Sequence, residues 1–324
     1  VEDLRGVMYK EAYPYQLATG TFLMLLTDEV QCNGLSNDTY ATVHQSGTPV
    51  FTFNPMMFDG IEVFPADVNA WKTYYEKIKG CNVVIDYVSE ISGTEEEKNA
   101  LVGQALFLRS FYYLKLATIY CQPYNAPGID VNTALGVPLI LTMELTDDFP
   151  RRVSLKALYE QIEKDLTEAS RLLKESGITK SKFHPSLGAC EFLFSRIYLY
   201  QEKWEKAITA STNAIAQGAL SRPIEGLYIH TENPEILYTG CIYGGLNASN
   251  FDKGWQVNPE LIELYDAGDA RLKSFFTSVD GKVGTVYYSR KNESTFSNIG
   301  FCNFRVAEAY LNRAEAYVQS GEIE

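Results

Sequence analysis

The strongest constraint on the fold is one well-specified helix between residues 94 and 119. Thr94 and Glu97 mark its start, because the threonine hydroxyl and the glutamate side chain can each bind the other residue's exposed backbone N–H group. The acidic first turn also complements the helix dipole. Apolar residues follow at steps of three and four, which places them on one helix face: Leu101, Ala105, Leu108, Tyr112, Leu116 and Ile119. The sequence therefore predicts a long helix with this face in the core.

Similar spacing predicts further helices along the chain, and one of them has a candidate N-cap, Asp67. Their expected ranges are about residues 67–91, a helix following Ser154, two helices within 185–218 with a break near 201–203, and residues 305–321.

Part of the chain has the spacing of a tetratricopeptide helix pair, in which small residues let two helices approach. Ser195 and Tyr198 stand in the first helix, Ala207 follows nine residues after Tyr198, and Ala214 follows seven residues later. This spacing predicts that the two helices within residues 185–218 form such a pair.

The first half of this pattern recurs twice. Ser110 and Tyr113 repeat it early in the chain, and we expect the helix after Ser154 to be their partner. Ala314 and Tyr317 repeat it late. The predicted fold is mostly α, with tetratricopeptide-like helix pairs in an interrupted superhelix and a long irregular subdomain containing minor β structure. One short strand is expected at residues 283–288.

Composition excludes several classes of function. With 28 Lys plus Arg against 41 Asp plus Glu, the formal net charge is −13, which repels nucleic acid and anionic membrane surfaces. No apolar run reaches the roughly 18 residues that a membrane-spanning helix needs. No two of the six cysteines lie closer than 40 residues, so no paired-cysteine metal or redox motif occurs, and the disulfide state stays open. Cys81 and Cys190 lie in helical patterns and are expected to be small buried hydrophobes.

The sequence offers no catalytic motif, metal motif or cofactor motif. Its three histidines, His44, His184 and His230, lie far apart, and His184 before Pro185 suggests a turn or capping role. We therefore expect a protein that is not an enzyme and uses no cofactor and no metal, although assistance from a calcium ion stays open.

Two charged groups have a structural interpretation. Asp266 and Asp269 with Arg271 suggest a metal or carboxylate pair, but we favour a helix end tied by an ion pair. The second group is a set of expected scaffold ion pairs on the last helix, Glu308 and Glu315 with Arg305 or Arg313.

Candidate ligand-binding residues lie in two irregular segments, 33–66 and 219–304, because long irregular segments between helices commonly hold binding sites. Both combine aromatic rings with Asn and Asp, as a glycan site requires. The alternative for Phe51 and Phe53 is a strand that packs on the core. The predicted ligand contacts are Phe51, Phe53, Phe58 and Asp59 in the first segment, and Tyr243, Asn247, Asn250 and Trp255 in the second.

Several stretches, in order, resemble the SusD/RagB family of outer-membrane nutrient-binding lipoproteins of Bacteroidetes type. The resemblance covers nearly the whole chain, and one stretch, Asn233–Leu237, is similar to RagB-like members. The matching stretches are Trp71 to Asn82, Gly103 to Tyr113, Gly136 to Leu139, Leu158 to Ala169, Leu199 to Ala207, Leu261 to Arg271 and Arg305 to Ala316.

The resemblance implies one SusD-like unit over residues 1–324. Its expected parts are a helical-repeat scaffold (67–120, 154–218 and 305–324), an insertion rich in Pro and Gly (121–153), and the two irregular segments on the ligand side. The family's lipid-attachment cysteine and C-terminal portion have no counterpart in these residues. We therefore expect membrane contact only through a lipid anchor that this sequence does not contain.

The resemblance also implies a function. It suggests non-catalytic binding of oligosaccharide or polysaccharide on the extracellular face of the outer membrane, followed by delivery to a SusC-like TonB-dependent barrel. Two alternatives stay open: an oligopeptide ligand for the same kind of importer, and a helical-repeat scaffold that binds only proteins.

Overall fold

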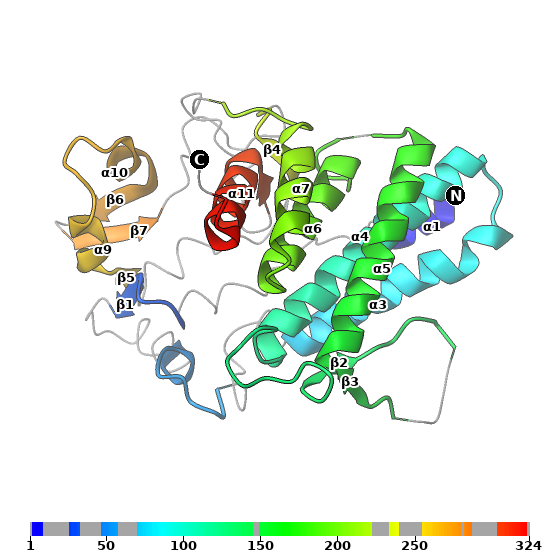
Figure 1. Ribbon diagram of the computed structural model, residues 1–324, viewed down its shortest axis with the longest axis horizontal. Coiled ribbons are helices and arrows are strands. Elements are labelled where there is room, and N and C mark those ends of the chain that lie inside the picture. Colours follow the sequence, from blue (N-terminus) through cyan, green and yellow to red (C-terminus); the bar gives the residue numbers. More distant parts are fainter. Residues whose placement is uncertain are drawn as a thin grey trace.

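The computed structural model describes residues 2–8, 26–32, 47–57, 70–144, 149–179, 181–221, 233–239, 255–279, 282–286 and 303–322. Helices predominate among these residues, which confirms the predicted mostly α class (Figure 1). The helices are α1 (Glu2–Val7), α3 (Ala70–Tyr87), the 3-10 helix η3 (Val88–Glu90), α4 (Glu95–Tyr120), α5 (Leu155–Ser176), α6 (Leu187–Tyr200), α7 (Trp204–Ile215), α9 (Pro259–Glu263), α10 (Ala270–Phe275) and α11 (Val306–Ser320).

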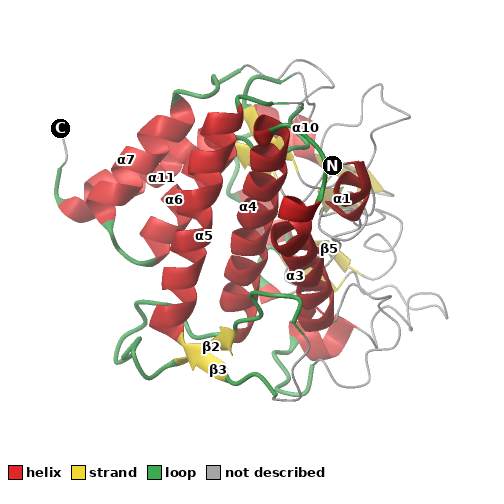
Figure 2. Cartoon of the chain, turned by 90° about the vertical axis from the view of Figure 1, so that its right-hand side faces the viewer, coloured by secondary structure: helices red, strands yellow, loops and turns green. Residues whose placement is uncertain are grey.

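The long helices form a row in which neighbours in sequence are neighbours in space. α3 packs on α4, α4 on α5, α5 on α6, and α6 on α7, and α11 then packs on α7 (Figure 2). The pairs α4–α5 and α6–α7 are the predicted tetratricopeptide-like units. In the first pair the Ser110 hydroxyl donates to the Ile162 carbonyl at 3.1 Å, so the predicted partner of Ser110 is confirmed.

The start of α4 follows its predicted cap. The Thr94 hydroxyl accepts from the Glu97 N–H at 3.2 Å, and the Glu97 carboxylate accepts from the Thr94 N–H at 3.2 Å. The predicted apolar face is buried from Leu101 to Leu116, whereas Ile119 is partly buried. Other faces of α4 are buried too, because α3 and α5 flank it and aromatic residues from distant strands cover it.

The other predicted helix boundaries are close to the observed ones. α5 begins directly after Ser154, as predicted, and the Ser154 side chain caps it by accepting from the Ala157 N–H. α6 and α7 are separated at residues 201–203, also as predicted. α3 ends at Tyr87 and continues as η3, so it is shorter than predicted, and its predicted cap, Asp67, lies outside the described residues.

The described strands form two-stranded antiparallel sheets, β1 with β5, β2 with β3, β4 with β8, and β6 with β7. The strand predicted at residues 283–288 corresponds to β7, of which residues 282–286 are described. The strands are β1 (Val30–Cys32), β2 (Leu135–Pro138), β3 (Arg152–Ser154), β4 (Ile236–Thr239), β5 (Trp255–Val257), β6 (Phe276–Val279), β7 (Lys282–Val286) and β8 (Asn303–Arg305).

An aromatic core joins the strand pair β4–β8 to the helices. Phe304 of β8 is fully buried and stacks on Phe192 of α6 with ring centroids 4.5 Å apart. It also meets Phe111 of α4 and Tyr238 of β4 edge-on, at 5.9 and 5.4 Å. Burying one such ring stabilises the fold by roughly 1.5–3 kcal/mol. The pair therefore fixes chain segments near residues 236 and 304 against the helical row.

Cys81 and Cys190 are fully buried within this core, as predicted. Burial raises the pKa of both thiols. They therefore act as small apolar residues.

The predicted ion pairs of the last helix have other partners. Glu308 pairs with Arg196 of α6, with Nε and Oε1 2.5 Å apart, and Arg305 pairs with the buried Glu235 at 2.7 Å. Arg313 donates to the Thr212 hydroxyl at 3.2 Å. The prediction of pairs within the helix is wrong because its neighbours α6 and α7 and strand β4 offer closer partners, which helical spacing cannot reveal.

Candidate functional site

The strand pair β1–β5 joins the second irregular segment to the residues directly before the first one. Val30 pairs with Val257, and Cys32 pairs with Trp255. The Asn258 side chain adds a hydrogen bond to the Asp28 carbonyl at 2.9 Å. The structure thus joins parts of the chain that lie 230 residues apart in sequence. In Figure 1 this pair, with β6, β7, α9 and α10, lies at the end of the molecule opposite α3 and α4.

β5 is held in place by the turn that follows it. The Asn258 side chain accepts from the Glu260 N–H at 3.1 Å and caps α9, and Pro259 occupies the first turn, where its missing N–H costs nothing. The backbone around Trp255 is therefore fixed from both sides, by β1 and by α9.

Three predicted ligand residues belong to described segments. Trp255 lies in β5, where only its backbone is described. Phe51 ends a helical turn at residues 47–51 and packs on the core while partly buried. Phe53 is 63 % exposed and has a positive φ of 53°, so it lies in a tight turn. The alternative of a core strand through Phe51 and Phe53 is wrong, because this segment is a helical turn followed by a bend.

The remaining predicted contacts lie outside the described residues, and they stay predictions: Phe58, Asp59, Tyr243, Asn247 and Asn250.

Sequence reasoning missed two exposed apolar residues in the same two segments, Met56 at 62 % and Leu264 at 82 % exposure. Neither lies in a pattern that distinguishes an exposed apolar residue from a buried one.

The charged motif after α9 is structural, as predicted. Arg271 donates to both carboxylate oxygens of Asp269, at 2.6–3.1 Å, and its guanidinium lies 4.7 Å from the ring of Tyr265. The hydrogen bonds from Arg271 lower the pKa of Asp269 to about 2. Within the described ranges, no group of three or more His, Cys, Asp or Glu side chains could hold a metal ion.

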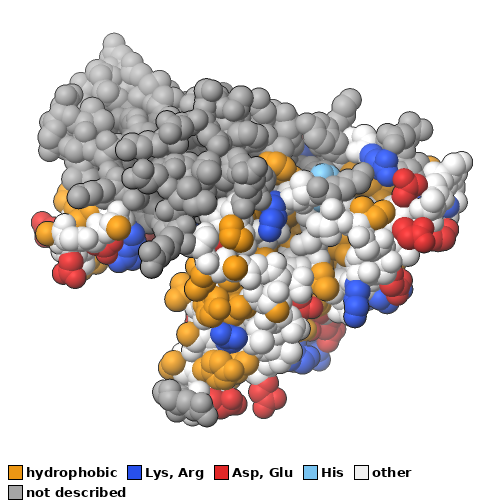
Figure 3. Space-filling model, turned by 90° about the horizontal axis from the view of Figure 1, so that it is seen from above, with side chains coloured by type: hydrophobic (Ala, Val, Ile, Leu, Met, Phe, Trp, Pro, Cys, Tyr) orange, Lys and Arg blue, Asp and Glu red, His pale blue; other side chains and the backbone are white. Residues whose placement is uncertain are grey.

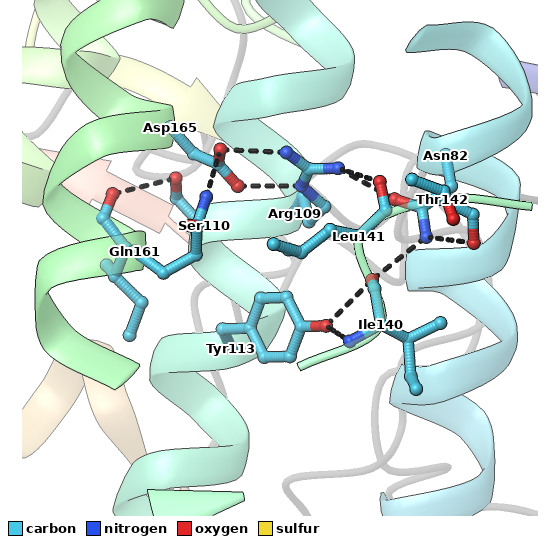
Figure 4. Close-up of polar contacts among 10 residues, drawn as sticks. Asn82, Arg109, Ser110, Tyr113, Ile140, Leu141, Thr142, Gln161 and Asp165 are labelled. Carbon is cyan, nitrogen blue, oxygen red and sulfur yellow. Dashed lines mark hydrogen bonds and ion pairs between the residues drawn. The ribbon is translucent and has the colours of Figure 1, made fainter. Parts of the chain in front are cut away.

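A buried polar network lies in the scaffold rather than on the ligand side (Figure 4). Arg109 of α4 donates to both oxygens of Asp165 of α5, at 2.6 and 2.8 Å. Its other nitrogen donates to Asn82 of α3 at 2.8 Å and to the Leu141 carbonyl at 3.0 Å. Burial by itself lowers the pKa of Arg109, but the hydrogen bonds and charge of Asp165 outweigh burial and raise it. This network stays charged and ties three helices together.

The same network holds the segment after β2 against α3 and α4. The Tyr113 hydroxyl bonds both the N–H and the carbonyl of Ile140, at 2.7 and 2.9 Å. The Asn82 amide donates to the Ile140 carbonyl at 2.9 Å, and the Tyr75 hydroxyl donates to the Pro138 carbonyl at 2.7 Å. The polar groups of these side chains form hydrogen bonds with backbone atoms of the segment after β2. Their role is therefore to position this loop.

His184 has the predicted turn role. Its Nδ1 lies 2.9 Å from the Ser181 hydroxyl, and its N–H donates to the Ser181 carbonyl. Ser186 is the residue that caps α6. His44 and His230 lie outside the described residues.

The comparisons with known proteins agree with this architecture. A family model described as "Starch-binding associating with outer membrane", of SusD-like type, matches residues 53–199. A putative sugar binding protein from Bacteroides vulgatus has 26 % sequence identity and a TM-score of 0.70, over 92 % of this chain and 68 % of that one. The chain therefore resembles the SusD-like family, in sequence over residues 53–199 and in fold over nearly its whole length.

Two further structures resemble this SusD-like protein at lower identity. A SusD superfamily protein from Bacteroides thetaiotaomicron has a TM-score of 0.75 and 20 % identity, over 99 % of this chain and 76 % of that one. A SusD-like carbohydrate binding protein from Bacteroides vulgatus has a TM-score of 0.73 and 21 % identity, over 99 % and 72 %. No curated protein sequence matches the chain significantly.

Two further features concern membrane-spanning helices and the stretch that is similar to RagB-like members. No helix in the part of the chain that the structure describes is long and apolar enough to span a membrane. The RagB-like stretch Asn233–Leu237 is buried except for Pro234, with Glu235 ion-paired to Arg305 and Leu237 in the core. It is therefore scaffold and does not distinguish peptide from glycan as the ligand.

Proposed function

We propose that this SusD-like protein binds oligosaccharide or polysaccharide at the cell surface without catalysing a reaction. The family description, which names starch binding and the outer membrane, is the single observation with most weight. The titles of two similar structures, a sugar binding and a carbohydrate binding protein, add support. Each comparison concerns a relative, so the ligand of this chain requires its own measurement.

The proposed ligand face is the side where β1 pairs with β5. That pairing brings the backbone of Trp255 next to the first irregular segment, which also contains the exposed Phe53. A sugar offers apolar C–H faces and many hydroxyl groups, so aromatic rings beside Asn and Asp side chains suit it. Tyr243, Asn247, Asn250 and Asp59 complete the proposed contacts.

The proposed partner is a TonB-dependent outer-membrane barrel, to which the protein passes its ligand. A lipid anchor would hold the protein at the extracellular face. Both proposals rest on the resemblance to this family, and the family description supports them only in naming the outer membrane.

Native affinity electrophoresis against a panel of polysaccharides tests the ligand class. We expect at least one polysaccharide in the gel to slow the protein relative to a non-binding reference protein. Phe53→Ala should reduce this retardation. Phe149→Ala is the matched control, because Phe149 is 96 % exposed but lies between β2 and β3, in the insertion rich in Pro and Gly and outside both irregular segments.

Unchanged migration in every gel would contradict the glycan proposal. Binding to an oligopeptide pool in the same preparation would then move the peptide alternative to first place. Binding to neither ligand class would favour a protein-binding scaffold.

A further inference from the structure

A pocket of about 400 Å³ lies between α6 and α7, and none of its lining residues belongs to the two irregular segments. Its volume is within the roughly 300–1,000 Å³ common for sites that bind small groups. α6 contributes Glu191, Phe194 and Tyr198, which share one helix face. A different face of α6 holds Arg196, which pairs with Glu308 of α11. The remaining lining residues come from α7: Glu205, Lys206, Thr209 and Ala210.

The floor of the pocket is aromatic. The rings of Phe194 and Tyr198 are stacked, with centroids 5.5 Å apart and planes 12° from parallel. Phe194 is buried and packs on the core, whereas Tyr198 is partly buried. The floor is therefore rigid, and the ring of Tyr198 is the part that a bound group can reach.

Tyr198 already attracts cations from its own chain. The Lys206 ammonium lies 5.3 Å from the ring centroid, and the Lys203 ammonium lies 5.8 Å from it. Lys203 is also held by Glu163 of α5 at 2.8 Å, whereas no ion pair of Lys206 occurs among the described residues. A cation over an aromatic face contributes about 0.5–1 kcal/mol at an exposed site. Lys206 therefore occupies the ring face without being fixed there.

Two carboxylates flank the aromatic floor. Glu191 accepts a hydrogen bond from the Asn213 amide at 3.1 Å. Burial raises the pKa of Glu191, against the smaller lowering effect of that hydrogen bond, so a nearby cation would favour its charged form. Glu205 is exposed at the rim, and neither glutamate is ion-paired within the described part of the chain.

Acidic side chains outnumber basic ones in the lining of the pocket. Burial, together with the smaller effects of the charges of Glu163 and Glu191, raises the pKa of Tyr198 to about 12. Burial and the charges of Glu163 and Glu160 act in the same direction on the neighbouring Tyr124. The lining itself has two carboxylates and one lysine, in a chain with a formal net charge of −13.

We propose that the pocket between α6 and α7 binds an arginine side chain from a basic segment of a partner protein. The planar guanidinium would lie over Tyr198 in place of Lys206 and would donate hydrogen bonds to Glu191 and Glu205. An arginine on a partner suits an open surface pocket, because its long aliphatic stem reaches in while the partner stays outside. This site is independent of the proposed glycan face and could serve a partner while a ligand is bound there.

The test is the binding of a fluorescein-labelled Gly-Arg-Gly-amide peptide, followed by fluorescence anisotropy at low salt. The control peptide has citrulline in place of arginine, which keeps the shape and removes the charge. We expect the arginine peptide to bind and the citrulline peptide to bind at least about fivefold more weakly, as for the loss of one charged contact. Raising the salt concentration should weaken the arginine peptide's binding.

Three variants locate the interaction. Glu191→Gln keeps the shape of the side chain and should weaken binding about fivefold. Lys206→Met removes the internal competitor and should tighten binding. Glu175→Gln on α5 changes the net charge as much as Glu191→Gln does, but Glu175 pairs with Arg171 outside the pocket, so binding should not change.

Equal binding of both peptides, or equal weakening by Glu191→Gln and Glu175→Gln, would overturn the proposal in favour of non-specific charge attraction. Weaker binding by Lys206→Met would also overturn it. If Glu191→Gln lowers the melting temperature, its binding result is set aside and the binding of the peptide to Lys206→Met decides the test. Lys206 is exposed, so its replacement leaves the core intact.

Discussion

The helical row from α3 to α7 and the strand-paired region around β1 and β5 differ in how they are held together. In the row, each helix packs on the next helix along the chain, and caps such as Thr94 and Ser154 lie directly before the helices they start. In the strand-paired region, β1 meets a partner that follows more than 200 residues later, through three residue pairs. The row is built from local contacts, and the strand-paired region from distant ones.

This difference separates stability from recognition. Helices that pack on each other through many buried side chains open rarely, whereas an isolated pair of short strands is marginally stable. The proposed ligand residues lie on the side with fewer supporting contacts, as is usual for binding segments carried by a rigid scaffold. The following predictions test whether the two regions can be perturbed separately.

The largest loss of unfolding free energy should come from breaking the buried ion pair between Arg109 and Asp165 in the helical row. Arg109→Ala leaves Asp165 charged and without its main partner, with both side chains no more than 6 % exposed in the native protein. We expect a loss of about 3–5 kcal/mol of unfolding free energy, measured by urea denaturation. Arg171→Ala is the control, because its pairs with Glu168 and Glu175 are exposed, and it should cost less than about 1 kcal/mol. Similar losses for both variants would mean that the network does not anchor the row.

The next largest loss of unfolding free energy should come from Gly218→Ala, because Gly218 lies very close to atoms of two other segments. A Cβ atom added at Gly218, after α7, would lie 2.7 Å from the Pro234 carbonyl oxygen and 2.7 Å from Val306. We expect Gly218→Ala to cost about 1–3 kcal/mol in the same assay, because the backbone must move. Gly268→Ala, in the strand-paired region, meets no atom within 4 Å and should be nearly neutral. Equal effects would show that the segment at Pro234 adapts easily.

Loss of the α4 cap should have a smaller effect. Thr94→Ala removes the acceptor for the Glu97 N–H, and we expect a loss of about 1 kcal/mol. Thr94→Ser retains the hydroxyl and should restore most of the stability. If serine and alanine at this position prove equally destabilising, the hydroxyl is not the stabilising group.

The smallest expected effect is a pH-dependent change in stability from the Asp269–Arg271 ion pair in the strand-paired region. The pKa of Asp269 is lowered from its ordinary value of 3.8 to about 2, so its ion pair with Arg271 stabilises the fold above pH 3.8. That stabilisation is lost as the pH falls through about 2. The difference in melting temperature between the wild type and Asp269→Asn should therefore be present at neutral pH and shrink below pH 4. A constant difference down to pH 2 would contradict this explanation.

Sequence reasoning was most accurate where contacts are local. The cap at Thr94, the break between α6 and α7, and the pairing of Ser110 with the helix after Ser154 follow from spacing alone. It was wrong where the partner is distant: nothing near Glu308 in sequence reveals Arg196 as its partner.

The candidate site was less predictable than the scaffold for the same reason. The pairing of Cys32 with Trp255 depends on strands too short for a clear period. Phe53 illustrates the ambiguity, since apolar alternation suggested a strand but a positive φ places it in a turn. The ligand contacts therefore remain predictions, whereas the family model and the shared fold support the SusD-like scaffold.

The most direct test of this account is a calorimetric titration of one retained polysaccharide into the wild type, Trp255→Ala and Phe149→Ala, with melting temperatures measured in parallel. We predict that Trp255→Ala lowers the affinity at least about tenfold, equal to about 1.4 kcal/mol, with an unchanged melting temperature, and that Phe149→Ala binds like the wild type. Wild-type affinity in Trp255→Ala would contradict the placement of the ligand on the β1–β5 side. A large drop in its melting temperature would instead show that Trp255 belongs to the core.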